Sequence, residues 1–110
     1  MRAARWLGQS RAEPAAPALR DALTHKEAAV RAEAALALGA LRSRQSVGAL
    51  CGLLAGDGNA MVREAAAQAL GIIGGAQAAN ALEAASQEDA KAKVRKAALA
   101  GLAAIRARRP

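Results

Sequence analysis

The chain has 110 residues, a formal net charge of +7 from 16 basic and 9 acidic side chains, and Trp6 as its only aromatic residue. This length allows a single domain, and no apolar run approaches the ~20 residues that a membrane-spanning helix needs, so we expect no membrane partner. One cysteine, Cys51, excludes an internal disulfide and is typical of a reducing compartment, so we expect a cytoplasmic protein. The positive charge is compatible with an acidic partner, but it is spread along most of the chain, which favours an ordinary solvated surface.

Alanine, leucine and arginine dominate the composition, and these residues favour helix over strand. The chain also repeats itself, since a Val-Arg pair recurs every thirty-two residues, at Val30-Arg31, Val62-Arg63 and Val94-Arg95. A period of this size indicates one supersecondary unit that is copied and stacked. Stacked units present extended binding surfaces more often than catalytic pockets.

The first segment, residues 1–13, reads as a half repeat. Leu7-Gly8 stands thirty-one residues before Leu38-Gly39, at the end of a second helix in the next unit. We therefore expect the second helix of a truncated unit, with Trp6 covering the open end of the stack.

Residues 14–45 form the first full repeat. Pro14 and Pro17 suit a helix start, and a short helix is predicted over Ala15–Leu23. A longer helix is predicted over Ala28–Leu41, because its apolar residues recur at helical spacing.

Residues 46–75 and 76–110 repeat this plan. In the second repeat, Ser46 and Asn59 are predicted helix caps, and Gly74-Gly75 is a predicted helix exit. In the third, the bend falls at Gln87–Asp89, between a short helix and a last one. The sequence thus predicts an all-α chain of stacked helix pairs with about seven helices, in which Val30, Val62 and Val94 occupy equivalent interior positions.

The segments 29–39 and 61–74 resemble HEAT-like repeats, and more narrowly the short bacterial class named after phycobilisome lyases. The resemblance covers nearly the whole chain, and the acidic residue that commonly precedes the Val-Arg pair is Asn59 in the second repeat and Lys91 in the third. It implies a right-handed α-solenoid of antiparallel helix pairs, whose second helices line a concave face. It also implies a scaffolding or protein-binding role, whereas some relatives act on bilins and some DNA glycosylases use a related stack.

Arg31, Arg63 and Arg95 occur once per repeat. We expect them to form a ladder that pins each repeat to a loop carbonyl or carboxylate, with Glu27, Asp57 and Asp89 as candidate partners. The alternative is a row of arginines that bind phosphate.

Helical spacing and the family's variable positions together predict the concave binding face. Its expected members are Glu33, Leu36, Glu64, Gln68, Ile72, Lys96 and Leu99, with small residues between them at Ala32, Ala35, Ala40, Ala65, Ala67, Ala97, Ala100 and Ala104. An exposed apolar strip of this kind is typical of a contact surface, and the alternative is burial by helix packing.

A basic cluster at the start of the last helix, Lys91, Lys93, Arg95 and Lys96, is a candidate anion patch. It supports nucleic-acid binding as the alternative function, although no aromatic residue is interleaved to stack on bases. His25 and a half-exposed Cys51 are not accompanied by the groups that a nucleophile or a zinc site needs, so we expect no enzyme, no metal and no cofactor. A bilin-lyase-type accessory is a remote alternative. The preferred prediction is a non-catalytic module that binds another protein, or a second copy of itself, through its concave face.

Overall fold

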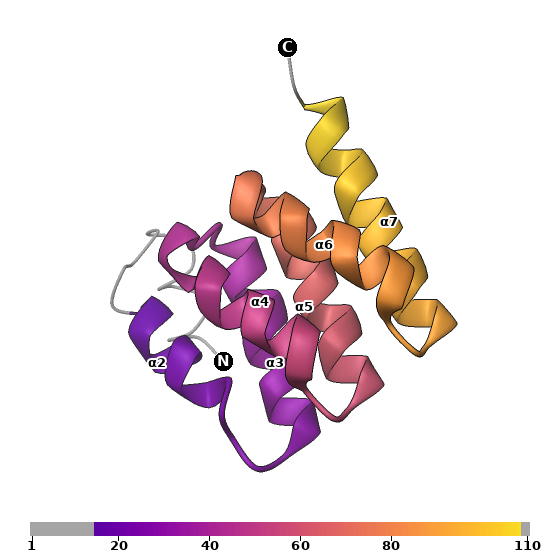
Figure 1. Cartoon of the computed structure of the whole chain (residues 1–110). Coiled ribbons are helices and arrows are strands. Elements are labelled where there is room, and N and C mark those ends of the chain that lie inside the picture. The colour runs from indigo at the N-terminus through magenta and orange to yellow at the C-terminus, as the bar shows by residue number, and fades with distance from the viewer. Residues whose placement is uncertain (1–14, 109–110) are drawn as a thin grey trace.

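The computed structural model describes residues 15–108, and the half repeat expected at residues 1–13 lies outside them. The described chain folds into six α-helices and one short 3-10 helix (Figure 1): α2 (Ala15–Ala22), α3 (Ala28–Ala40), η1 (Arg44–Ser46), α4 (Val47–Gly56), α5 (Ala60–Ile73), α6 (Ala76–Glu88) and α7 (Ala92–Ala107). No strand occurs between residues 15 and 108. The predicted all-α class is confirmed, and the three predicted helix pairs are present.

The helix pairs stack side by side into an α-solenoid of two layers. Helices α2, α4 and α6 form one layer, and α3, α5 and α7 form the other (Figure 1). The molecule measures 38 × 38 × 19 Å, and its short dimension matches two helices of ~10 Å diameter each. The most extensive contacts join α5 to α3 and to α7, so the second helices form the continuous part of the stack.

Helix α5 begins and ends at the residues that the sequence indicated. The Asn59 side chain accepts hydrogen bonds from the Met61 and Val62 amides at 2.9 and 3.3 Å, which satisfies two otherwise unpaired donors. Beyond Ile73, Gly74 and Gly75 take φ angles of 81° and 96°, a conformation that glycine adopts without a steric penalty. Both predicted features of this helix are confirmed.

Ser46 precedes α4, as predicted, but it makes no capping hydrogen bond there. Its side chain is buried, and its hydroxyl lies 2.7 Å from that of Ser43 and 3.4 Å from Nη1 of Arg20. The prediction that the Ser46 side chain caps α4 was therefore wrong. Ser46 is the last residue of η1 and has helical rather than extended backbone angles, and its hydroxyl contacts Ser43 and Arg20 instead of the amides of α4.

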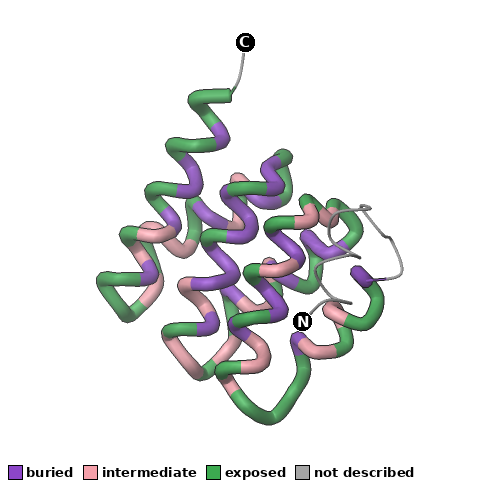
Figure 2. Tube along the Cα trace, turned by 180° about the vertical axis from the view of Figure 1, so that it is seen from behind, coloured by how far each residue is buried: buried purple, intermediate pink, exposed green. Residues whose placement is uncertain are grey.

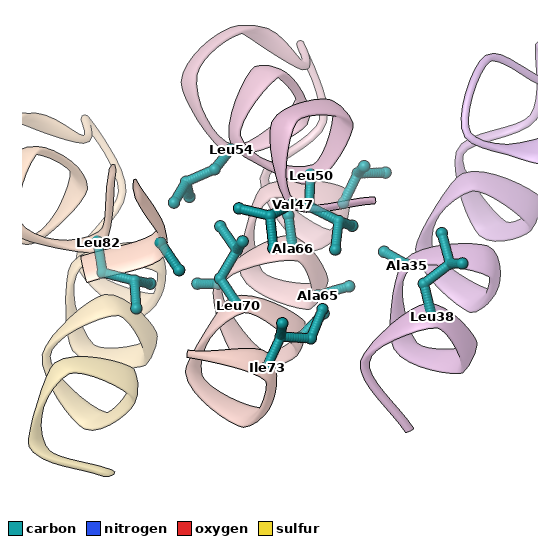
Figure 3. Close-up of a cluster of buried hydrophobic side chains, with 14 of the residues drawn as sticks. Ala35, Leu38, Val47, Leu50, Leu54, Ala65, Ala66, Leu70, Ile73 and Leu82 are labelled. Carbon is teal, nitrogen blue, oxygen red and sulfur yellow. The ribbon is translucent and has the colours of Figure 1, made fainter. Parts of the chain in front are cut away.

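One aliphatic core runs through the three repeats. Its largest fully buried apolar side chains include Leu38, Leu50, Leu70 and Leu82, which lie on four successive helices from α3 to α6. Figure 3 shows Leu70 between the neighbouring helices, and Figure 2 shows the buried positions following the inner sides of the helices. Burial of each such side chain contributes roughly 1.5–3 kcal/mol to the free energy of folding.

Val62 and Val94 are fully buried at equivalent positions, but Val30 is only half-buried. The expectation of three equivalent valines was wrong for the first repeat. Helix α2 has eight residues, against ten in α4 and thirteen in α6, so it covers less of its partner helix.

Small residues let the second helices approach closely. A Cβ atom placed on Gly39 would lie 2.7 Å from Cα of Ala69, and one on Gly71 would lie 2.6 Å from Cα of Gly101. Real Cβ atoms do not come so near another backbone. This explains how a chain without Phe or Tyr builds a close-packed core.

Candidate binding groove and arginine ladder

The first step of the arginine ladder joins Arg31 in α3 to the loop before α5. Its Nε and Nη2 donate to the two carboxylate oxygens of Asp57 at 2.8 and 3.1 Å. Its Nη1 donates to the His25 and Lys26 carbonyl oxygens of its own loop at 2.8 and 3.1 Å. The guanidinium thus ties one repeat to the next in a fixed geometry.

Arg63 repeats the arrangement one unit later. Its Nε and Nη2 donate to Asp89 at 2.8 and 3.2 Å, and its Nη1 donates to the Asp57 carbonyl oxygen at 2.7 Å. The predicted ladder is confirmed with Asp57 and Asp89 as partners. Glu27 is exposed and does not pair with Arg31, because the next repeat's Asp57 already occupies the bidentate edge.

The ladder changes the acidity of its carboxylates. Burial raises the pKa of Asp57, but hydrogen bonds from Arg31 and from the Asn59 amide, with the charges of Arg31 and Arg63, outweigh it. The same balance acts on Asp89 through Arg63, the Lys91 amide and Arg95. The pKa of both carboxyls therefore lies below the ordinary value, and both groups are charged at neutral pH.

A groove of about 680 Å³ lies over the contact between α5 and α7. Apolar, small and charged residues together line it. The lining residues are Arg42, Glu64, Gln68, Gly71, Ile72, Lys93, Lys96, Ala97, Ala100, Gly101, Ala104 and Arg108.

Two of these arginines are held in place by the end of α5. Nη1 of Arg42 donates to the Ile72 carbonyl oxygen at 2.8 Å, and Nη2 of Arg108 donates to the Gly71 carbonyl oxygen at 3.0 Å. The last carbonyls of a helix have no partner within the helix and carry partial negative charge, so cations are favoured there. Arg42 reaches this place from a left-handed backbone conformation, with φ of 53°.

The groove has a surplus of positive charge. Four of its lining side chains are cationic, and Glu64 is the one carboxylate among them. Nζ of Lys93 lies 3.9 Å from Oε1 of Glu64, a distant contact that leaves most of the lysine charge available. Lys96 is exposed at the same end, twelve residues and about 18 Å of helix from Arg108.

The structure brings part of the predicted concave face together. Glu64, Gln68, Ile72 and Lys96 line the groove. Glu33, Leu36 and Leu99 are exposed but lie outside it. Ala97, Ala100 and Ala104 also line it, whereas Ala32, Ala35, Ala65 and Ala67 are buried, because each second helix packs against its neighbours in the stack as well as its own pair.

The candidate anion patch is divided between different surroundings. Lys93 and Lys96 line the groove, while Lys91 is exposed at the start of α7 and does not. Arg95 is half-buried and donates to the Asp89 carbonyl oxygen at 2.7 Å, so it belongs to the ladder.

The residues considered for chemistry do not form a site. Cys51 is half-buried, and burial raises the pKa of its thiol, which disfavours the nucleophilic thiolate. Its Sγ lies 3.9 Å from the Gln77 carbonyl oxygen. Nδ1 of His25 accepts a hydrogen bond from the Glu27 amide. Within residues 15–108, no three His, Cys, Asp or Glu side chains gather as a metal site would require, and no helix is long and apolar enough to cross a bilayer.

Sequence reasoning missed Arg42 and Arg108 as groove residues. In the sequence, Arg42 directly follows the helix predicted over Ala28–Leu41, and Arg108 is one of several arginines close together after Ile105. The available signal was that both arginines lie near the end of a repeat, where free helix carbonyls attract cations. The carbonyls that they bind belong to the second repeat, however, and only the stacking of the repeats brings them close.

Comparison with known proteins agrees with this architecture. The sequence profile described as HEAT repeats matches residues 1–57 and 17–103, which together cover most of the chain. No curated protein matches the chain. With its matched segments and its stacked helix pairs, the chain belongs to the HEAT-repeat family.

Proposed function

We propose that the protein is a non-catalytic binding module that holds an acidic segment of another protein in the groove between α5 and α7. The observation that carries this proposal is the composition of the groove, where apolar and small residues occur together with four cationic side chains. HEAT repeats are commonly protein-interaction scaffolds, which supports the class of function.

The shape of the groove favours an amphipathic segment. Ile72, Ala97 and Ala100 offer apolar contact, and the cations at Lys96 and Arg108 are about 18 Å apart along α7. A bound helix with acidic residues near both ends and aliphatic residues between them would match this pattern.

The experiment compares two labelled peptides by fluorescence anisotropy. One has glutamates and leucines at helical spacing, and the other has lysines in place of the glutamates. We expect the acidic peptide to bind more tightly and to lose affinity as salt is added, because exposed charges are screened. Lys96→Glu should weaken it about fivefold to tenfold, and Ile72→Asp should weaken it as well.

The matched control is Lys26→Glu, which reverses an exposed lysine in the loop before α3, away from the groove. Equal affinity of the wild type, Lys96→Glu and Ile72→Asp for the acidic peptide would count against the groove. A preference for the lysine peptide would refute the charge argument.

Nucleic acid is the second candidate ligand, because Arg42, Lys93, Lys96 and Arg108 converge on one surface. It ranks lower because Trp6 is the chain's only aromatic residue and Glu64 lies among the cations. Duplex DNA binding that weakens in Lys96→Glu and has a salt slope of ~0.9 per neutralised phosphate would favour it over the peptide. Sedimentation across a range of concentrations tests whether a second copy is the partner.

The short period supports membership of the phycobilisome-lyase-type class of bacterial HEAT repeats. The single cysteine supports a cytoplasmic location. Neither assignment bears on the groove chemistry.

A further inference from the structure

One stripe of three residues recurs on the side of each second helix that faces the next repeat. In α3 it consists of Arg31, Ala35 and Gly39, and in α5 of Arg63, Ala67 and Gly71. In both sets the arginine donates hydrogen bonds to an aspartate of the next repeat. The two small residues are buried where the second helix of that repeat packs. We call this set the stacking stripe.

In α7 the stacking stripe consists of Arg95, Leu99 and Ala103. Leu99 is 55% exposed where Ala35 and Ala67 are fully buried, and Ala103 is exposed. Helix α7 has extensive contacts with α5 and α6 only, within the part of the chain that the structure describes. An exposed leucine at a position where the other repeats bury an alanine marks a candidate contact surface.

Arg95 keeps the orientation of its two counterparts. Its Nη1 donates to the Asp89 carbonyl oxygen at 2.7 Å, as Nη1 of Arg63 does to the Asp57 carbonyl oxygen at the same distance. In Arg31 and Arg63, the Nε and Nη2 edge then holds a carboxylate with two hydrogen bonds. No carboxylate among residues 15–108 forms an ion pair with Arg95.

The replaced residues disfavour a fourth repeat at this place. A Cβ on Gly39 or Gly71 would lie within 2.8 Å of the next helix backbone, and Ala103 carries such a Cβ at the equivalent position. A helix that followed with the same spacing would collide with it. A partner bound to this face must therefore lie further from α7 than a following repeat would. It would still contact the exposed Leu99.

A second copy stacked in the direction of the repeats is also mismatched. Its first loop carries His25 thirty-two residues before Asp57, and Nδ1 of His25 accepts the Glu27 amide at 3.0 Å, just as Oδ1 of Asp57 accepts the Asn59 amide at 2.9 Å. The other nitrogen of a neutral imidazole then carries the hydrogen. It would present a donor to the donors of Arg95.

We propose that the outer face of α7 is a second interaction surface, separate from the groove, on which Arg95 receives an aspartate or glutamate of a different protein beside an aliphatic contact on Leu99. Neither Arg95, Leu99 nor Ala103 lines the groove, so this surface stands independently of the function proposed above. The partner is recognised by a carboxylate held in two charge-assisted hydrogen bonds, as Arg31 and Arg63 hold Asp57 and Asp89.

The test titrates the isotope-labelled full chain with a synthetic peptide that has the sequence of residues 53–62. This peptide carries the chain's own ladder aspartate between aliphatic residues. We expect the Arg95 Nε–H and Leu99 methyl signals to shift at peptide concentrations up to a few millimolar. A peptide with Asn in place of that aspartate should bind about tenfold more weakly, since charge-assisted bonds are lost.

Variants of the chain provide the second arm. Arg95→Gln and Leu99→Ala should each weaken the aspartate peptide, and Arg106→Gln, which alters an exposed arginine on the same helix, should not. The peptide comparison remains decisive if Arg95→Gln destabilises the loop before α7.

Three results would overturn the proposal. One is the absence of any shift at Arg95 and Leu99. Another is equal binding of the aspartate and asparagine peptides, or shifts confined to groove residues such as Ile72. The third is a mass that rises with chain concentration and returns to the monomer in Leu99→Asp, which would assign the face to a second copy.

Discussion

At the scale of single residues, the ladder aspartates combine a structural role with a dependence on pH. Asp57 and Asp89 each have a side chain less than a tenth exposed and a bidentate arginine partner. A carboxyl whose pKa is lower in the folded chain than in the unfolded one stabilises the fold above the unfolded-state pKa of ~4. That stabilisation disappears as the pH falls through the folded-state pKa.

We therefore expect the free energy of unfolding, measured by urea denaturation, to fall as the pH is lowered below about 5. Asp57→Asn should cost ~1–3 kcal/mol at neutral pH, because it leaves the half-buried Arg31 without its charged acceptor. It should also reduce the loss of stability in acid. Glu33→Gln, at an exposed position, serves as the control. An identical acid dependence in wild type and Asp57→Asn would show that the pair does not control this behaviour.

At the scale of helices, the distance between α5 and α7 is set by residues without side chains. Gly71 and Gly101 bring the two backbones together, and the groove lies above this contact. A side chain at either position would separate the helices and change the width of the groove.

Gly71→Ala should destabilise the protein by ~1–3 kcal/mol, because the added methyl group meets the backbone of α7. Gly52→Ala is the matched control, since nothing lies within 4 Å of a Cβ at that position in α4 and alanine is the better helix former. It should raise the free energy of unfolding by up to ~1 kcal/mol. Thermal or urea denaturation measures both changes, and a neutral Gly71→Ala would mean that the helices separate at little cost.

The helices themselves could be predicted from the sequence, whereas their surfaces could be predicted only in part. The Asn59 cap and the Gly74-Gly75 exit are local signals, and the two helices of the first repeat end within one residue of their predicted bounds. The bend predicted at Gln87–Asp89 was too early, because α6 continues to Glu88. Ala65 and Ala67 were placed on the binding face but are buried, because an alanine's surroundings depend on how closely the next repeat approaches.

The same reason explains the partial prediction of the site. Lys96 and Ile72 line one groove, but their convergence with Arg42 and Arg108 depends on three repeats at once. The sequence also contained the change from Ala67 and Gly71 to Leu99 and Ala103. Its meaning becomes clear only when the structure shows that the equivalent glycines, Gly39 and Gly71, face the following repeat.

At the scale of the whole molecule, stability is shared between neighbours along the stack. Helix α5 contacts α3, α4, α6 and α7, so the middle repeat supports both others. In such arrays the stability is approximately a sum of repeat terms and interface terms, and a change at the centre acts on two interfaces.

Leu70→Ala should therefore reduce the free energy of unfolding by ~2–5 kcal/mol, because Leu70 is fully buried in the central helix. Leu36→Ala removes the same atoms from a leucine that is 43% exposed on α3, and it should change stability little. Urea denaturation of both variants gives the comparison. A similar small loss in both would mean that the core relaxes around the cavity.

The two arginines that bind the end of α5 join all three repeats at the groove itself. Arg42 comes from the first repeat and Arg108 from the third, and both donate to the last turn of the second. Each guanidinium uses one nitrogen for these carbonyls, so its other N–H groups can meet a carboxylate while the end of α5 stays held.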